Sequence, residues 1–87
     1  MKLLIEVNQN DIDNGVQGVS CKCPVARAIK RTMRIKGVEV NADYILLKSG
    51  KTSIECAVPA SVMRFINIFD EGAKVKPFKF NLNIEGI

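Results

Sequence analysis

The stretch Ser20-Cys-Lys-Cys-Pro-Val-Ala-Arg-Ala-Ile-Lys-Arg-Thr-Met-Arg-Ile-Lys36 predicts the first long helix of the fold. The helix is expected to begin at Pro24, because a proline at the first helical position lacks only an N–H that would have no partner there. Gly37 is expected to end it near Ile35, since glycine is favoured just past the last turn. The spacing of its apolar residues gives the helix one buried face.

The opposite face of this helix is basic. At roughly 100° per residue, one arc carries Arg27, Lys30, Arg31 and Arg34, and the other carries Val25, Ile29, Thr32 and Met33. Two interpretations stay open: the solvated face of an amphipathic helix, or a surface whose planar guanidinium groups bind phosphate oxygens. In the second, Lys22 and Cys23 join the site, because backbone N–H groups at a helix N-terminus favour anions.

The bulk composition predicts one small globular domain over residues 1–87. The chain is 47% hydrophobic and 25% charged, which argues against disorder, and its formal net charge of +4 is a mild lean toward anionic partners. The N-terminal apolar run is broken by Glu6, unlike a signal peptide, and no apolar run is long enough to span a membrane. Three cysteines, an odd count, fit a reducing compartment, so we expect a cytoplasmic protein.

The N-terminal segment predicts a strand followed by a short capped helix. Leu3–Val7 is apolar enough to form a strand at the centre of a sheet. Asn8 fits an N-cap, and Asp11, three residues on, fits the partner of a capping box. The helical turn is expected over Gln9–Asn14, with Gly15 ending it in the left-handed conformation.

The middle of the chain predicts a β-hairpin. Val38–Lys48 is expected to be extended, with an interruption near Asn41–Asp43. Ser49-Gly50 predicts a tight turn, after which Lys51–Val58 returns as the hairpin partner. Alternation along the returning strand places Cys56 on the core side.

The last third predicts a second helix and a final strand. Pro59 begins a helix that ends near Glu71, before Gly72. Its expected buried stripe consists of Val62, Phe65, Ile66 and Phe69. Phe78–Ile84 alternates apolar and polar residues, which is typical of a strand with one solvated face.

The element order is therefore β-α-β-β-α-β. It predicts an α+β protein of the ferredoxin-like kind, with two helices on one face of a small antiparallel sheet. Another small α+β arrangement stays open, because the connection over residues 8–22 and the break near Asp43 are irregular. The outward positions of the predicted sheet hold no aromatic side chain; they are Lys2, Leu4, Glu6, Ser53, Glu55 and Ala57. This argues against RNA binding by base stacking on the sheet face.

The cysteines carry no signature of metal binding or catalysis. Cys21, Cys23 and Cys56 could furnish three zinc ligands, but the chain has no histidine and no Cys-x-x-Cys pair. Cys23 beside Lys22 at a helix N-terminus could be a reactive thiolate, yet no histidine can act as its base. Buried or capping cysteines are the simpler interpretation. We therefore expect no metal, no cofactor and no enzymatic activity.

Two apolar side chains of the second predicted helix fall outside its buried stripe. Met63 lies on the flank and Ile68 near the opposite side, beside Arg64. Either a loop covers them, or they face a second copy in a homodimer or a partner protein. The second interpretation makes Met63, Arg64 and Ile68 a candidate partner interface.

Four motifs in chain order carry a resemblance to a known group of proteins. They are Asn8-x-x-Asp11-Ile-Asp-x-Gly15, Cys23-Pro-Val-Ala-x-Ala-Ile-Lys-Arg31, Pro59 with Arg64-Phe-Ile-x-x-Phe-Asp70, and Val75-x-Pro-Phe-x-Phe80. With these motifs the chain resembles small uncharacterised proteins of tailed bacteriophages. The resemblance implies a phage or prophage origin, a location in the host cytoplasm and a stoichiometric binder of a host component. The resemblance assigns no functional role to any residue of this chain.

These observations predict a non-enzymatic binding protein. The expected ligand bears phosphate, as a nucleic acid or a nucleotide signal, and the expected contacts are Arg27, Lys30, Arg31, Arg34, Lys22 and Cys23. Binding would serve to counter a host system. The alternative is a protein–protein inhibitor or assembly module that uses Met63, Arg64 and Ile68, for which the basic helix supplies complementary charge. No membrane partner is expected.

Overall fold

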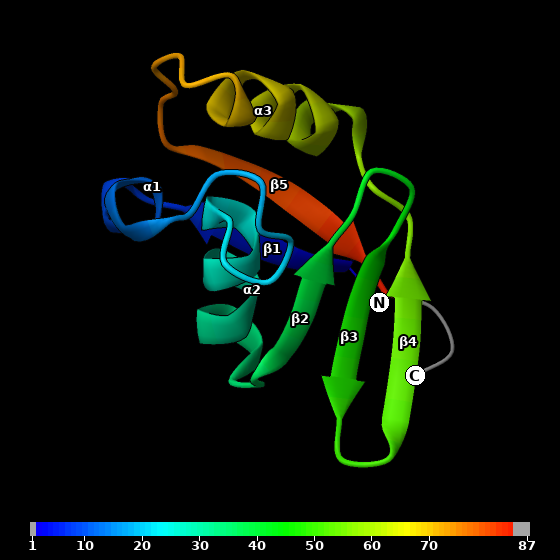
Figure 1. Cartoon of the computed structure of the whole chain (residues 1–87). Helices are drawn as coiled ribbons and strands as arrows, with labels where there is room; N and C mark the ends of the chain where they lie inside the picture. Colours follow the sequence, from blue (N-terminus) through cyan, green and yellow to red (C-terminus); the bar gives the residue numbers. More distant parts are fainter. Residues whose placement is uncertain (1, 85–87) are drawn as a thin grey trace.

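A computed structural model describes residues 2–84 of the protein. Its elements are β1 (Lys2–Val7), α1 (Gln9–Asn14), α2 (Pro24–Met33), β2 (Gly37–Val40), β3 (Ile45–Ser49), β4 (Thr52–Cys56), α3 (Ala60–Asp70) and β5 (Phe78–Asn83) (Figure 1). The strands form two antiparallel sheets: β1 pairs with β5, while β2, β3 and β4 follow one another in the second. The predicted α+β class is confirmed.

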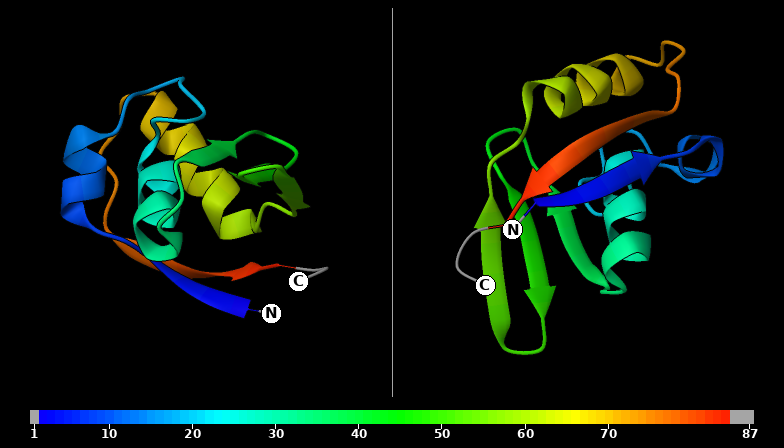
Figure 2. Two further views of the ribbon diagram at one scale, coloured as in Figure 1. Left: turned by 90° about the horizontal axis from the view of Figure 1, so that it is seen from below. Right: turned by 180° about the vertical axis from the view of Figure 1, so that it is seen from behind.

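The helix α2 lies at the centre of the arrangement. It stands between the β1–β5 ribbon and β2, and it contacts β1, β2 and α1 (Figure 1). The ribbon crosses the end of the three-stranded sheet at a steep angle, and α3 lies over β5 (Figures 1 and 2). On the other side of α2, away from the three-stranded sheet, lies α1 (Figure 2).

The core is formed by one apolar face from each of the larger elements. Its members include Ile5 and Val7 of β1, Val25, Ala28 and Ile29 of α2, Val38, Val40, Ile45 and Leu47 of β2 and β3, and Phe80 and Leu82 of β5. A row of aromatic rings joins α3 to β5: the centroids of Phe65 and Phe78 are 4.6 Å apart, and those of Phe78 and Phe80 are 5.8 Å apart. Burial of this apolar surface is the main stabilising contribution, to which the ring contacts add.

Signals local in the sequence placed most helix ends correctly. The helix α1 spans Gln9–Asn14 as predicted, because Asn8 and Asp11 form both hydrogen bonds of the capping box. The helix α3 begins directly after Pro59, and Gly72, with a φ of 83°, lies just past its end. Cys56 is buried, as the alternation along its strand predicts.

The ferredoxin-like arrangement is not what the chain adopts. The predicted extended region Val38–Lys48 folds back on itself, because the N–H of Asn41 donates to the carbonyl of Tyr44 at 2.9 Å and closes a turn. Val38 thereby pairs with Leu47 on the neighbouring strand, and β4 adds to β3. Among the described residues β1 pairs with β5 alone, so the strands divide into two sheets.

Gly15 is needed for close packing, whereas the prediction assigned it a left-handed conformation. Its φ is −72°, which any residue can adopt. A Cβ at this position would lie 2.6 Å from Cδ of Pro24, closer than real Cβ contacts come. The first residue of α2 therefore packs directly on the backbone that follows α1.

The end of α2 also differs from the prediction. The helix ends at Met33 because Arg34 adopts the left-handed conformation, with a φ of 58°. Gly37, predicted to end the helix, is instead the first residue of β2. A Cβ on Gly37 would lie 2.7 Å from Cβ of Lys48, so the strand pairing excludes a side chain there.

The contact between Gly15 and Pro24 can be tested by a double-mutant cycle. Gly15→Ala should lower the free energy of unfolding by about 2 kcal/mol, because an extra methyl in a closed contact costs about 1–3 kcal/mol. Chemical denaturation measures this cost. It should be smaller in a Pro24→Ala background, which removes the ring atoms that the methyl meets. Strictly additive costs would show that the two residues do not interact in this way.

Candidate functional site

A hollow of about 420 Å³ opens between α1, α2 and the loop that precedes α2. Four cationic side chains line it, namely Lys22, Arg27, Lys30 and Arg31, and α1 contributes Asn10, Asp11 and Asn14. We call it the α1–α2 pocket. Four positive charges less one negative charge give its lining a formal charge of +3. It is therefore an electropositive concavity of a size that small ligands occupy.

Asp11 anchors the pocket from the α1 side. Its side chain is only 1% exposed, and no other charged side chain among residues 2–84 is buried. Oδ2 accepts from the backbone N–H of Asn8 at 3.0 Å, and Oδ1 accepts from Nη1 of Arg31 at 2.5 Å. The same guanidinium donates from Nη2 to the carbonyl of Glu6 at 2.7 Å. Charge-assisted hydrogen bonds of this kind are strong, so one guanidinium joins β1, α1 and α2.

Arg27 carries an unused donor in the wall of the pocket. Its Nε is buried and has no hydrogen-bond partner among the described residues. Oδ1 of Asp11 lies 4.0 Å away, which is an ion-pair distance but too long for a hydrogen bond. A buried N–H without an acceptor is unfavourable, so the side chain would gain if its guanidinium turned toward the pocket and met an oxygen of a bound anion.

The loop before α2 is fixed by one hydrogen bond from α2 and one to α3. Nζ of Lys30 donates to the carbonyl of Cys21 at 2.5 Å. Nε2 of Gln17 donates to the carbonyl of Phe69 at the end of α3, at 2.9 Å. These bonds fix the rim of the pocket, from which the exposed side chain of Lys22 extends.

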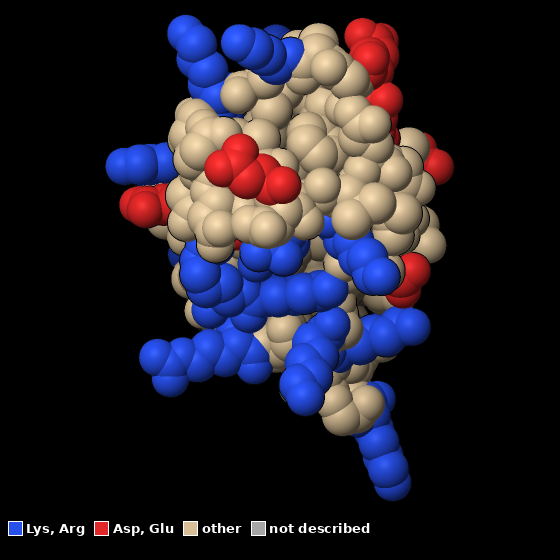
Figure 3. Space-filling view, turned by 60° about the vertical axis from the view of Figure 1, so that its left-hand side comes forward, with Lys and Arg blue, Asp and Glu red and all other residues tan. Residues whose placement is uncertain are grey.

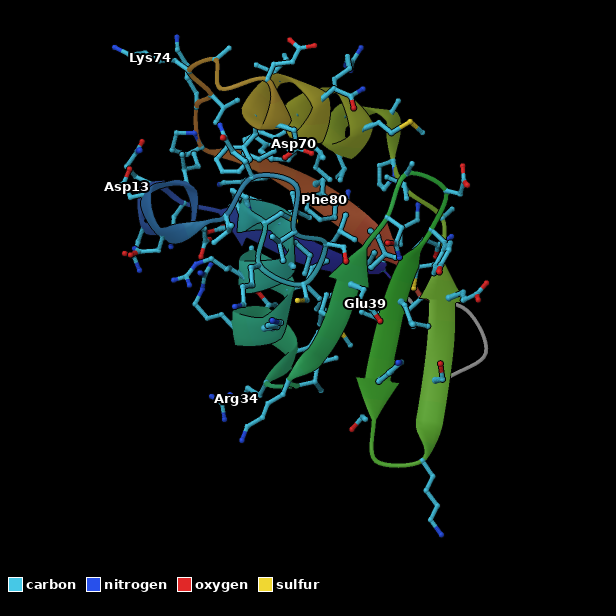
Figure 4. All side chains as sticks on the ribbon, in the orientation of Figure 1. Asp13, Arg34, Glu39, Asp70, Lys74 and Phe80 are labelled. Atoms are coloured by element: carbon cyan, nitrogen blue, oxygen red, sulfur yellow. The ribbon has the colours of Figure 1, made fainter. Side chains whose placement is uncertain are left out.

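The pocket lies within a broader basic surface. On the face that carries α1 and α2, a band of Lys and Arg side chains crosses the lower half, while others lie at the top and at the left edge (Figure 3). Arg34 lies at the far end of α2, outside the pocket lining (Figure 4). Lys74 lies at the opposite end of the molecule from Arg34, so the two cations do not belong to one group. Of the six residues predicted to contact the ligand, the pocket brings together Lys22, Arg27, Lys30 and Arg31 and leaves out Arg34 and Cys23.

Cys23 is the N-cap of α2. Its Sγ accepts from the N–H of Ala26 at 3.4 Å, and the residue is 3% exposed and part of the core. Burial raises the pKa of the Cys23 thiol above its ordinary value, because the charged thiolate is disfavoured there. The thiol therefore stays protonated near neutral pH, which is the opposite of an activated nucleophile.

The three residues of the predicted partner interface are spread around α3. Met63 is 43% exposed and lines a second, mostly apolar hollow of about 280 Å³ together with Ile66. Ile68 is 42% exposed and lies about 140° further around the helix. Arg64 is exposed and lines neither hollow. These side chains do not form one compact apolar patch.

No three Cys, Asp or Glu side chains within residues 2–84 come close enough together to hold a metal ion. Cys21 is half-buried and lines the α1–α2 pocket, whereas Cys23 and Cys56 are buried. None of the helices over the same residues has the length and apolar character needed to cross a membrane.

The α1 wall of the pocket was missed by sequence reasoning. From the sequence, Asp11 is expected only to cap a helix, and Asn10 and Asn14 receive no role. All three line the pocket because α1 packs against α2. Counted from Asn10, Asp11 is one residue and Asn14 four residues further along the chain, so all three lie on one side of the helix. This polar side of α1 is the sequence signal from which the wall could have been predicted.

Comparison with protein-family models, curated proteins and solved structures finds no match to this chain. The resemblance to phage proteins therefore stays a prediction from the motifs. The function has to be argued from the geometry of the pocket.

Replacement of Asp11 tests its role as the anchor. Asp11→Ala should lower the free energy of unfolding by about 3 kcal/mol, because it removes one side of a capping box and the buried partner of Arg31. Asp11→Asn should cost less, since an amide oxygen can still accept from the N–H of Asn8. Asp13→Ala on the same helix is the matched control, because Asp13 is exposed, and it should cost under about 0.5 kcal/mol. Equal costs for Asp11→Ala and Asp13→Ala would contradict the role of Asp11.

The buried thiol of Cys23 predicts a loss of stability at alkaline pH. Its folded-state pKa is raised, so the unfolded chain releases the proton first, and stability falls as pH rises above the ordinary thiol pKa of about 8.5. Urea denaturation at about pH 7.5 and about pH 9.5 should show a larger loss in the wild type than in Cys23→Ser, whose hydroxyl can still cap α2. The same pH dependence in both proteins would exclude Cys23 as the cause.

Proposed function

We propose that the protein is a non-enzymatic binder of a phosphate-bearing ligand, and that the phosphate binds in the α1–α2 pocket. The observation that carries the proposal is the gathering of four cationic side chains around one concavity, among them Arg27, whose buried Nε has no partner within the described residues. Phosphate oxygens would accept charge-assisted hydrogen bonds from these cations, and from Nε of Arg27 once its guanidinium turns toward the pocket. The surrounding basic band would attract the anion from a distance (Figure 3).

The four cations would act in different ways. Lys30 and Arg31 are held by acceptors of the protein, with one of three ammonium donors and two of five guanidinium donors engaged. The charged groups of these two side chains would therefore be held in place before the ligand binds, which lowers the entropic cost of binding. Arg27 contributes the unpaired Nε, and Lys22 is an exposed point charge at the rim.

The groups around the pocket support binding rather than catalysis. The chain has no histidine, and the carboxylate of Asp11 is engaged by Asn8 and Arg31. General acid–base chemistry near neutral pH needs a titrating group with access to the ligand. A fixed set of hydrogen-bond donors suits recognition of an anion.

A protein–protein inhibitor or assembly module is the second candidate function. It rests on Met63 and Ile68, which α3 leaves exposed. Their separation of about 140° around the helix makes one shared patch difficult to form. In either case, the phage resemblance makes a component of a host cell the expected partner.

Equilibrium binding at low salt tests the proposed site. Pyrophosphate, a nucleoside monophosphate, and an RNA and a DNA oligonucleotide serve as probes. At least one should bind, with an affinity that falls as salt rises, because screening weakens charge attraction. Lys22→Gln and Arg27→Gln should each weaken binding about tenfold, the effect of losing one hydrogen bond to a charged group.

Arg34→Gln is the matched control for this experiment. It removes the same charge from α2 but lies outside the pocket lining, so the affinity should change by less than about twofold. Equal losses of affinity in Arg27→Gln and Arg34→Gln would show that the probes bind an unspecific basic surface and not the pocket. No binding of any probe at low salt would overturn the proposed function.

A further inference from the structure

The two walls of the α1–α2 pocket differ in chemistry. The α2 wall and the rim carry the positive charges, from Lys22 to Arg31. On the facing α1 wall, Asn10 and Asn14 present uncharged amides, and Asp11 between them is engaged by Asn8 and Arg31. A ligand that is anionic along its whole length would use only one of these walls. A ligand with an anionic end and a neutral polar end would use both.

The amides of the α1 wall have free hydrogen-bonding capacity. Nδ2 of Asn14 donates to the backbone carbonyl of Asn10 at 2.9 Å and to its Oδ1 at 2.7 Å. Within residues 2–84, the structure assigns no hydrogen bond to Oδ1 of Asn14 or Nδ2 of Asn10. One acceptor and one amide donor group therefore remain on a wall that lines the pocket. A hydroxyl group both donates and accepts, so it can pair with either.

The pocket offers no platform for a nucleobase. No aromatic side chain lines it, and its apolar residues are Val16 and Cys21. Proteins that hold bases in single strands use stacking on aromatic rings for much of their affinity. Recognition here would therefore come from the phosphate and from hydroxyl groups, with little dependence on a base.

We infer that the ligand is a phosphorylated pentose, with its phosphate on Arg27 and Lys22 and its hydroxyl groups on Asn10 and Asn14. This rests on the proposed function and narrows it. A volume of about 420 Å³ suits a molecule of that size. Within a DNA strand the sugar oxygens are esterified and no 2′-hydroxyl is present, so interior DNA lacks this chemistry. A free sugar phosphate, a ribonucleotide and RNA all carry it.

Titration calorimetry at fixed ionic strength tests the inference with five probes. They are inorganic phosphate, ribose 5-phosphate, a pair of ribonucleoside monophosphates with different bases, and an RNA oligonucleotide with a 5′-phosphate. Ribose 5-phosphate should bind about tenfold more tightly than inorganic phosphate, as expected for one or two added neutral hydrogen bonds. The two monophosphates should agree within about threefold. An RNA that binds more tightly than ribose 5-phosphate would identify RNA as the source of the same chemistry.

The double variant Asn10→Ala with Asn14→Ala separates the two walls. It should bind ribose 5-phosphate no more tightly than inorganic phosphate, while its affinity for inorganic phosphate stays that of the wild type. The retained phosphate affinity also shows that the variant folds. Asn81→Ala, at an exposed position of β5 outside the pocket, is the matched control and should behave as the wild type.

The two proposals fail in different ways. If wild-type protein binds inorganic phosphate and ribose 5-phosphate equally, the inference is wrong and the phosphate site stands. The same conclusion follows if the double variant keeps the preference for ribose 5-phosphate. If neither anion binds, and no other phosphate probe does at low salt, both proposals are overturned.

Discussion

The hydrogen-bonded ion pair between Asp11 and Arg31 is the interaction on which the N-terminal half of the molecule depends. A helix of six residues such as α1 is not stable in water by itself. Here Asp11 closes the capping box within α1 and accepts from Arg31 of α2, which also donates to the carbonyl of Glu6 at the end of β1. Three successive elements therefore meet at this ion pair. The amide-bearing wall of the pocket has its position because α1 is held there.

The same carboxylate sets the charge of the pocket. A buried carboxylate needs a positive partner, and Arg31 supplies it at 2.5 Å. Arg27 stays at 4.0 Å, so one acid stands between two guanidinium groups and cannot neutralise both. Lys30 donates to a backbone carbonyl, which leaves its charge uncompensated. The local excess of +3 thus follows from how the side chains are arranged, and the mild net charge of the whole chain would not reveal it.

Features that depend on neighbours in sequence could be predicted, and those that depend on tertiary packing could not. Asn8 and Asp11 identified the start of α1, and periodicity identified the basic arc of α2. The division into two sheets depends on one turn after β2 and on β1 pairing with a strand from the other end of the chain. Likewise, the burial of Asp11 follows from the packing of α1 on α2, and a capped turn would ordinarily be expected to be solvated.

The basic face of α2 has two parts with different surroundings. Arg34 takes the left-handed position that ends α2 and lies outside the pocket, as a solvated side chain would. Arg27 and Arg31 sit where α1 and the preceding loop turn a convex helix surface into a concave one. A convex stripe presents its charges to separate regions of solvent, whereas a concavity presents them to one ligand. Shape, more than the number of positive charges, therefore decides which cations of α2 can act together on a single phosphate.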